Sequence, residues 1–89
     1  MSLSASEKLI AEMWSALLAT EIIDPATNFF EAGGDSFFAL VFSTYLRERY
    51  NIEIEGALLF EAPTVREFAH RIESLLPLEA GGDLIEDAF

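Results

Sequence analysis

The chain has 89 residues, which allows one small domain and leaves no room for a separate cofactor-binding half. Its 16 acidic and 5 basic residues give a formal net charge of -11, so nucleic acid and membrane surfaces, which are themselves anionic, are disfavoured as partners. The chain contains no cysteine, which excludes disulfides, cysteine-based zinc sites and thiol chemistry from its own side chains. The longest apolar run, residues 37–42, is too short to span a membrane, and the first residues lack the basic region of an export signal. We therefore expect a cytoplasmic protein.

The first periodic segment predicts an α-helix that starts near Ser4 and fades near Ala19 or Thr20. Ser4 and Glu7 have the spacing of a capping box, in which each side chain satisfies a backbone N–H of the other residue. Apolar residues recur on one face of this helix: Leu9, Ile10, Met13, Trp14, Leu17 and Leu18. From residue 21 to residue 35 this periodicity stops and turn-forming residues appear, which indicates a long loop. We expect its apolar residues to hold it against the core: Ile22, Ile23, Phe29 and Phe30.

A second helix is predicted from the end of this loop to about Tyr50, with Asp35 and Ser36 standing where N-cap residues are preferred. One of its faces has the spacing of a core face: Ala39, Phe42, Leu46 and Tyr50. The opposite face carries a second, mostly apolar set: Phe37, Leu40, Val41 and Thr44. Either this helix is covered on both sides, as a central helix of a bundle would be, or the second set is a docking patch for a partner.

The remaining segments complete an all-α fold. Residues 51–55 alternate like a strand but have no second strand to pair with, so we interpret them as an extended connection, followed by one helical turn over residues 57–61. Thr64 and Glu67 form a second capping box at the start of a last helix, which Pro77 ends. Its predicted buried face contains Val65, Phe68, Ala69, Ile72, Leu75 and Leu76. We predict a small four-helix bundle over residues 1–77, with three main helices, one short helix and a long loop between the first two, and an acidic, flexible tail over residues 78–89.

Ser36 has two interpretations when the residues are considered alone. A serine at a helix start is commonly just a cap, whose loss would cost about 1 kcal/mol of stability. The site is also suited to a phosphate, because the Gly33–Gly34 pair allows close backbone approach and the helix dipole favours negative charge. Nucleophilic catalysis would need a base, and the one histidine, His70, is predicted to lie on the surface of the last helix. We therefore expect no catalytic residues, and the scattered carboxylates indicate no metal site.

Two motifs resemble those of a known family. The segment NFFEAGGDS at residues 28–36 and the segment FEAPT at residues 60–64 are similar to those of the thiolation domains, or peptidyl carrier proteins, of nonribosomal peptide synthesis, in the acyl carrier protein-like superfamily. The resemblance covers roughly residues 6 to 76. It implies that Ser36 carries a covalent 4′-phosphopantetheine arm, with Gly33, Gly34 and Asp35 around it, and that the domain itself catalyses nothing. The thiol missing from the sequence would then be supplied by the arm.

The same resemblance implies a shuttle that holds an amino acid or related acyl group as a thioester. Its partners would be a phosphopantetheinyl transferase using coenzyme A and magnesium, an adenylation enzyme, and downstream condensation, tailoring or thioesterase enzymes. Phe37, Leu40 and Val41 become the expected docking residues, with Leu58 on the short helix as a weaker candidate. Transient docking suits such a shuttle, because successive partners must bind and release the same small face. We also expect a monomer.

Two alternatives remain. An acyl carrier protein of polyketide or fatty-acid synthesis uses the same arm with different loading enzymes, although Arg47 and Arg49 flank Glu48 where fatty-acid carriers have a run of acids. A plain helical interaction module would use Ser36 only as a cap and bind one fixed partner.

Overall fold

The computed structural model describes residues 3–77. In chain order these residues form α1 (Ala5–Leu18), α2 (Ser36–Tyr50), α3 (Leu58–Glu61), α4 (Val65–Ile72) and the single 3-10 turn η1 (Glu73–Leu75). Over this range the structure contains no strand, only an isolated antiparallel bridge between Asn28 and Thr64. The predicted all-α fold with three main helices, one short helix and a long loop is therefore confirmed. The predicted acidic tail lies outside the described residues.

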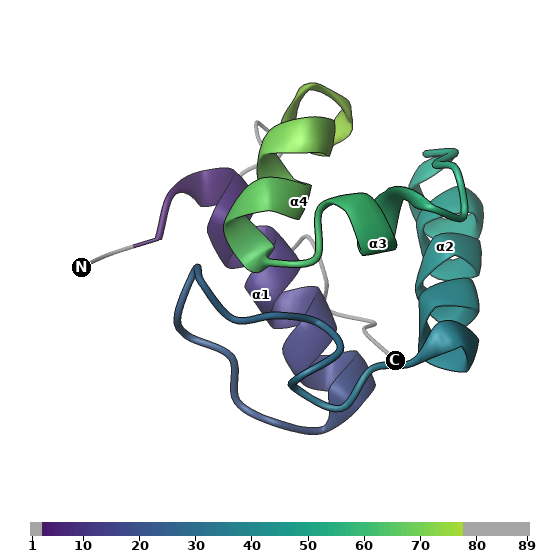
Figure 1. Cartoon of the computed structure of the whole chain (residues 1–89). Helices are drawn as coiled ribbons and strands as arrows, with labels where there is room; N and C mark the ends of the chain where they lie inside the picture. Colours follow the sequence, from purple (N-terminus) through teal and green to yellow (C-terminus); the bar gives the residue numbers. More distant parts are fainter. Residues whose placement is uncertain (1–2, 78–89) are drawn as a thin grey trace.

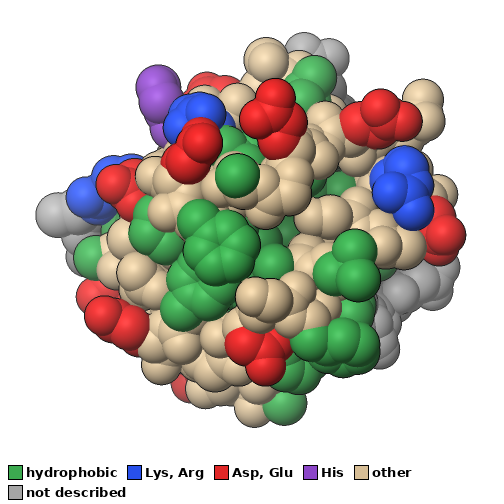
Figure 2. All heavy atoms as spheres, turned by 45° about the vertical axis from the view of Figure 1, so that its right-hand side comes forward, with side chains coloured by type: hydrophobic (Ala, Val, Ile, Leu, Met, Phe, Trp, Pro, Cys, Tyr) green, Lys and Arg blue, Asp and Glu red, His purple; other side chains and the backbone are tan. Residues whose placement is uncertain are grey.

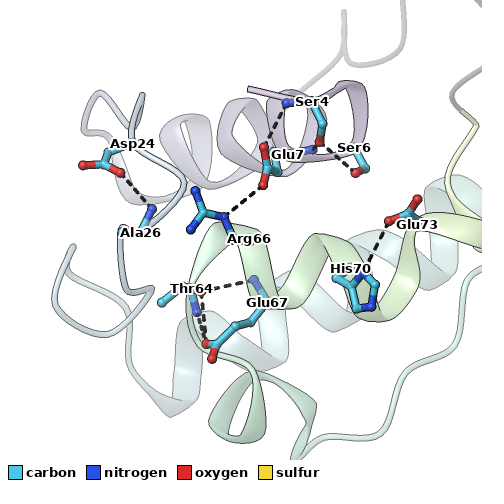
Figure 3. Close-up of polar contacts among 10 residues, drawn as sticks. All are labelled: Ser4, Ser6, Glu7, Asp24, Ala26, Thr64, Arg66, Glu67, His70 and Glu73. Carbon is cyan, nitrogen blue, oxygen red and sulfur yellow. Dashed lines mark hydrogen bonds and ion pairs between the residues drawn. The ribbon is translucent and has the colours of Figure 1, made fainter. Parts of the chain in front are cut away.

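Both predicted capping boxes are present at the helix starts (Figure 3). In α1 the Glu7 amide donates to Ser4 Oγ over 3.2 Å, and the Ser4 amide donates to Glu7 Oε1 over 2.9 Å. Thr64 and Glu67 make the same pair of bonds at the start of α4, over 3.1 and 3.3 Å. Each box satisfies backbone N–H groups that a helix start leaves without a partner, so the local sequence alone determines where α1 and α4 begin. At the other end of α1, Ala19 takes the left-handed conformation with φ 56°, which ends the helix near the predicted residue.

The core is organised around the indole ring of Trp14, which is completely buried. Its ring lies 5.0 Å from that of Phe29 in the long loop, 5.8 Å from Phe68 in α4 and 6.3 Å from Phe42 in α2, measured between centroids. Aromatic rings at such separations and tilts attract one another in addition to the area that they bury. One residue of α1 thus contacts the long loop, α2 and α4, and these ring contacts hold the loop against the helices.

Most of the residues predicted to face the core are buried or half-buried, whereas Ile23 and Leu75 are exposed. Ile23 is 69% exposed and therefore does not hold the loop to the core, whereas its neighbour Ile22 is buried. Leu75 is 53% exposed because the chain changes from an α-helix to a 3-10 turn after Ile72, and the tighter turn moves Leu75 off the buried face. Leu76, which follows that turn, is buried as expected.

The arrangement of the helices brings the start of α2 to one end of the molecule (Figure 1). The loop after α1 runs back along the molecule and leads directly into α2, and the short α3 lies between α4 and α2 (Figure 1). On α2 the predicted core face is correct: Ala39, Phe42 and Leu46 are buried, and Tyr50 is half-buried.

In residues 3–77 we find no helix with the length and apolar character that a membrane crossing requires.

Candidate functional site

The loop that precedes Ser36 is held in place by the start of α4. The Phe29 amide donates to the carbonyl of Pro63 over 2.7 Å, and the Val65 amide donates to the carbonyl of Thr27 over 3.0 Å. These two bonds flank the bridge between Asn28 and Thr64. The two sequence motifs, at residues 28–36 and 60–64, are therefore paired in space, although more than twenty residues separate them in the chain. The second motif acts on the candidate site by fixing the path of the loop.

Aromatic stacking adds to this pairing of the two motifs. The rings of Phe30 and Phe60 stack with centroids 4.8 Å apart and an interplanar angle of 19°. Phe30 is half-buried, while Phe60 is 56% exposed. The stack thus connects the loop before α2 to the short α3 at the surface of the protein.

The two glycines before Ser36 are required for different reasons. Gly33 has φ 118°, a conformation that residues with a side chain rarely adopt. Gly34 donates its amide to the Phe29 carbonyl over 2.9 Å, and a Cβ atom at Gly34 would overlap the buried Phe29 ring. The sequence alone suggests that the pair lies next to a bound phosphate. In the structure its visible role is to turn the loop tightly against the core just before α2.

Asp35, and not Ser36, is the N-cap of α2. The Asp35 carboxylate accepts from the Phe38 amide over 2.9 Å, and the Asp35 carbonyl accepts from the Ala39 amide over 2.8 Å. Ser36 is the first residue inside the helix. The expectation that loss of the Ser36 hydroxyl costs the energy of a helix cap is therefore wrong, because the cap belongs to its neighbour.

The surroundings of Ser36 fit a phosphopantetheine group. Its side chain is exposed, which leaves the hydroxyl accessible to a modifying enzyme, and the positive end of the α2 dipole favours a phosphodiester at this position. The Asp35 carboxylate is already engaged as the cap, so its role here is to position the serine. Within residues 3–77 no group of three or more histidine, aspartate or glutamate side chains is placed to hold a metal ion.

His70 lies on the surface of α4, as predicted. Its Nδ1 atom is 3.7 Å from Glu73 Oε1, and 84% of its side chain is exposed. Figure 3 shows this contact near the end of α4, away from the capping box at Thr64. The polar contact that the described structure gives His70 is thus with its own end of the last helical segment.

The proposed docking residues differ in their exposure. Phe37 and Leu40 are 65% and 64% exposed, and Val41 is half-buried, so the second face of α2 is an open surface in the described structure. Leu58 is only 9% exposed and belongs to the core, so the expectation that it contacts partners needs correction. Its neighbour Phe60 provides the exposed apolar side chain of α3 instead. A helix of four residues has too few positions to show which residue faces out, which explains the error.

Hydrophobic side chains gather on the face that α2 and α3 share. Figure 2 shows them exposed there, with most of the charged side chains toward the edge of the view. A group of exposed apolar side chains on one face of a small protein is typical of an interaction surface. Ser36 begins α2 and therefore lies at one end of this surface.

A compact helical domain with an exposed serine at the start of α2, beside an apolar patch, has the features of a carrier domain. In agreement, residues 8–72 match the sequence family described as a phosphopantetheine attachment site. The chain belongs to this family, whose cofactor is covalent 4′-phosphopantetheine.

Similar proteins include large peptide synthases. The chain is 35% identical over 66 residues to gramicidin S synthase 2 of Brevibacillus brevis, and the match covers 74% of this chain and 2% of that protein. It is 35% identical over 68 residues to surfactin synthase subunit 2 of Bacillus subtilis, covering 76% of this chain and 2% of that protein. The chain thus spans a very small part of these relatives.

Solved structures of peptidyl carrier proteins have the same fold. One match is to a structure of the phosphopantetheine transferase Sfp in complex with coenzyme A and a peptidyl carrier protein, with a TM-score of 0.72 and 28% identity over 81% of this chain and 94% of that chain. Another is to an active-site mutant of a peptidyl carrier protein, with a TM-score of 0.74 and 27% identity over 83% of both chains. The resemblance to peptidyl carrier proteins that the two motifs indicate is therefore confirmed.

Proposed function

We propose that Ser36 is the attachment point of the phosphopantetheine arm, and that the domain carries an amino acid or related acyl group as a thioester in nonribosomal peptide synthesis. The observation that supports this most directly is the exposed Ser36 hydroxyl, which is free of the capping role because Asp35 performs it. When bound, the arm supplies the thiol that a chain without cysteine lacks. Similarity to the gramicidin and surfactin synthases supports the assignment to peptide synthesis.

We infer that a separate enzyme performs the attachment, because the one histidine of the chain, the commonest general base, lies on the exposed surface of α4 beside Glu73. The donor is coenzyme A, and the catalyst is a phosphopantetheinyl transferase that uses magnesium. The Ser36 Oγ atom forms a bond to phosphorus, the bond from that phosphorus to the oxygen of 3′,5′-adenosine bisphosphate breaks, and the hydroxyl proton passes to a base of the transferase. The domain itself contributes the positioned hydroxyl and no catalytic residue.

Other partner enzymes load the carried acyl group onto the arm and remove it. An adenylation enzyme loads the arm, and condensation, tailoring or thioesterase enzymes take the cargo onward. Phe37, Leu40 and Val41 form the docking surface for these enzymes, with Phe60 of α3 beside them. A small patch of this kind favours transient contacts, which a carrier needs in order to leave one partner for the next.

The nature of the cargo is tested by loading the modified protein in two ways. In one reaction it is given adenylation enzymes, ATP and a panel of amino acids, and in the other it is given acyltransferases with acyl-coenzyme A donors. We expect mass spectrometry to detect an aminoacyl thioester in the first reaction. Loading only by the acyltransferases would instead assign the protein to polyketide or fatty-acid synthesis.

A further inference from the structure

A groove of about 270 Å³ lies between the segment that leads into α3 and the end of α4. Its lining side chains come from residues 53–58 on one side and from residues 71–75 on the other. None of the described lining residues belongs to α2 or to the loop before Ser36. Figure 1 shows the end of α4 at the top of the view, whereas α2 begins near the bottom. The groove is therefore separate from Ser36 and from the apolar face of α2.

The floor of this groove is apolar. Leu58 and Ile72 are 9% and 2% exposed and belong to the core, and Ile54 on the same floor is half-buried. Leu75 lies at the edge and is 53% exposed, because the 3-10 turn after Ile72 moves it off the buried face. An apolar side chain of another molecule placed against Leu75 would remove this surface from water, which is favourable.

The edges of the groove are mainly acidic. Glu53 and Glu55 are exposed on one side, and within residues 3–77 neither carboxylate has an ion-pair partner. Arg71 lies on the other side, where its Nη2 atom already donates to Glu61 Oε1 over 3.3 Å. The carboxylates around the groove thus outnumber the one guanidinium group, whose charge Glu61 partly balances.

The charge of the edges indicates which kind of molecule fits the groove. A second copy of this chain is unsuited, because two chains with a net charge of -11 repel each other. An acidic segment is unsuited for the same reason, since Glu53 and Glu55 would repel it. A segment that combines apolar side chains with lysine or arginine complements both the floor and the edges.

We propose that this groove is a docking site for a short basic and apolar segment of a partner protein. Apolar side chains of the segment pack against Leu75 and the floor, and a lysine or arginine pairs with Glu53 and Glu55. Because the site lies apart from the α2 patch, a partner bound here stays in place while other enzymes contact α2. Such binding raises the effective concentration of the partner near the carrier without any contact to Ser36.

The groove is tested with the full, unmodified chain and short synthetic peptides as probes. The first peptide contains only leucine, lysine and serine. In the second, glutamate replaces lysine, and in the third, serine replaces leucine. We expect NMR titration with the first peptide to shift the amides of Ile54, Ile72 and Leu75. The second and third peptides should bind about tenfold more weakly, because one reverses the charge and the other removes the apolar contact.

Variants of exposed residues locate the site without disturbing the core. We expect the double variant Glu53→Gln/Glu55→Gln to bind the first peptide about fivefold more weakly. The double variant Glu12→Gln/Glu21→Gln removes the same charge outside the groove and should leave the affinity unchanged.

A second pair of variants tests the apolar contact. Leu75→Ala should weaken binding of the first peptide about fivefold, whereas Ile23→Ala, which truncates another exposed apolar residue, is the matched control and should have no effect.

Equal losses in the two glutamate double variants, with shifts spread over the acidic surface, would show general charge attraction and overturn the proposal. It would also be overturned by shifts confined to α2, by equal or tighter binding of the glutamate peptide, or by no binding of the first peptide at millimolar concentration. Each of these results leaves the attachment at Ser36 untouched, since the unmodified chain is used.

Discussion

Gly34 and the ring of Phe29 occupy adjoining space so closely that a Cβ atom on the glycine would overlap the ring. Phe29 is fully buried against Trp14, so the ring has little freedom to move away. The loop that leads into Ser36 is thus packed directly on the centre of the core.

We expect Gly34→Ala to lower the free energy of unfolding by about 1–3 kcal/mol, the usual cost of forcing extra atoms into a packed site. The same change should slow the modification of Ser36, because the displaced loop carries the start of α2. Urea denaturation and the initial rate of modification measure the two effects. Gly56→Ala is the matched control and should leave both unchanged, since a Cβ atom there has open space around it. A free energy of unfolding equal to that of the wild type in Gly34→Ala would contradict the close packing of Gly34 against the Phe29 ring.

Substitutions at Asp35 and Ser36 should differ in their effect on stability, because only Asp35 caps α2. Asp35→Ala removes the carboxylate that accepts from the Phe38 amide and should cost about 1 kcal/mol of stability. Ser36→Ala should stay within about 0.5 kcal/mol of the wild type, because an exposed first-turn residue that does not cap the helix contributes little. Thermal and urea unfolding of both variants measure these differences. A larger loss of stability in Ser36→Ala than in Asp35→Ala would show that Ser36, and not Asp35, caps α2.

Glu7 predicts a dependence of stability on pH. The Ser4 backbone N–H, chiefly, and the Arg66 guanidinium hold the pKa of Glu7 below its usual value of 4.5. Because the pKa is lower in the folded state, this stabilisation is present above about pH 4.5 and is lost as the pH falls through the folded-state pKa. We expect Glu7→Gln to be less stable than the wild type at pH 7 and to approach it in acid, as urea denaturation over a pH series would measure.

The control for this experiment is Glu12→Gln, which removes the same charge from the exposed side of α1 without touching the capping box. It isolates the general effect of reducing the net charge. If the difference between Glu7→Gln and the wild type did not shrink on acidification, the assignment of the stabilisation to the ionised Glu7 would be wrong.

The sequence predicts α1 and the start of α4 well because their signals are local, whereas α4 ends at Ile72 and not at Pro77 as predicted. In each capping box the two partners, Ser4 with Glu7 and Thr64 with Glu67, lie close together in the sequence. The apolar face of α1 likewise repeats along a single helix. The phase of α2 is likewise correct, since fifteen residues define a periodic face.

The errors lie where no such local signal exists. Ile22 and Ile23 are neighbours of the same residue type, and only the three-dimensional path of the loop determines that the second is exposed. Leu58 and Phe60 lie in a helix of one turn, where periodicity carries no information. The assignment of the cap to Asp35 depends on the local backbone geometry at a site where both residue types are good caps.

The exposed face of α2 predicts a loss of partner recognition without a loss of stability. Phe37→Ala should lower kcat/KM for modification by a phosphopantetheinyl transferase about tenfold, as truncation of an aromatic interface residue commonly does. Its melting temperature should change little, because the side chain is 65% exposed. Leu75→Ala, a similar truncation of an exposed residue outside α2, should leave kcat/KM unchanged. Equal effects of both variants would contradict a docking surface on α2.

The most direct test of Ser36 as the carrier residue is an intact mass spectrum after incubation with coenzyme A, magnesium and a phosphopantetheinyl transferase of broad specificity. We expect a gain of one phosphopantetheinyl group in the wild type and none in folded Ser36→Ala. Modification of the Ser36→Ala protein, or an unmodified wild type alongside a second carrier that the same transferase modifies, would contradict the assignment of Ser36 as the carrier residue.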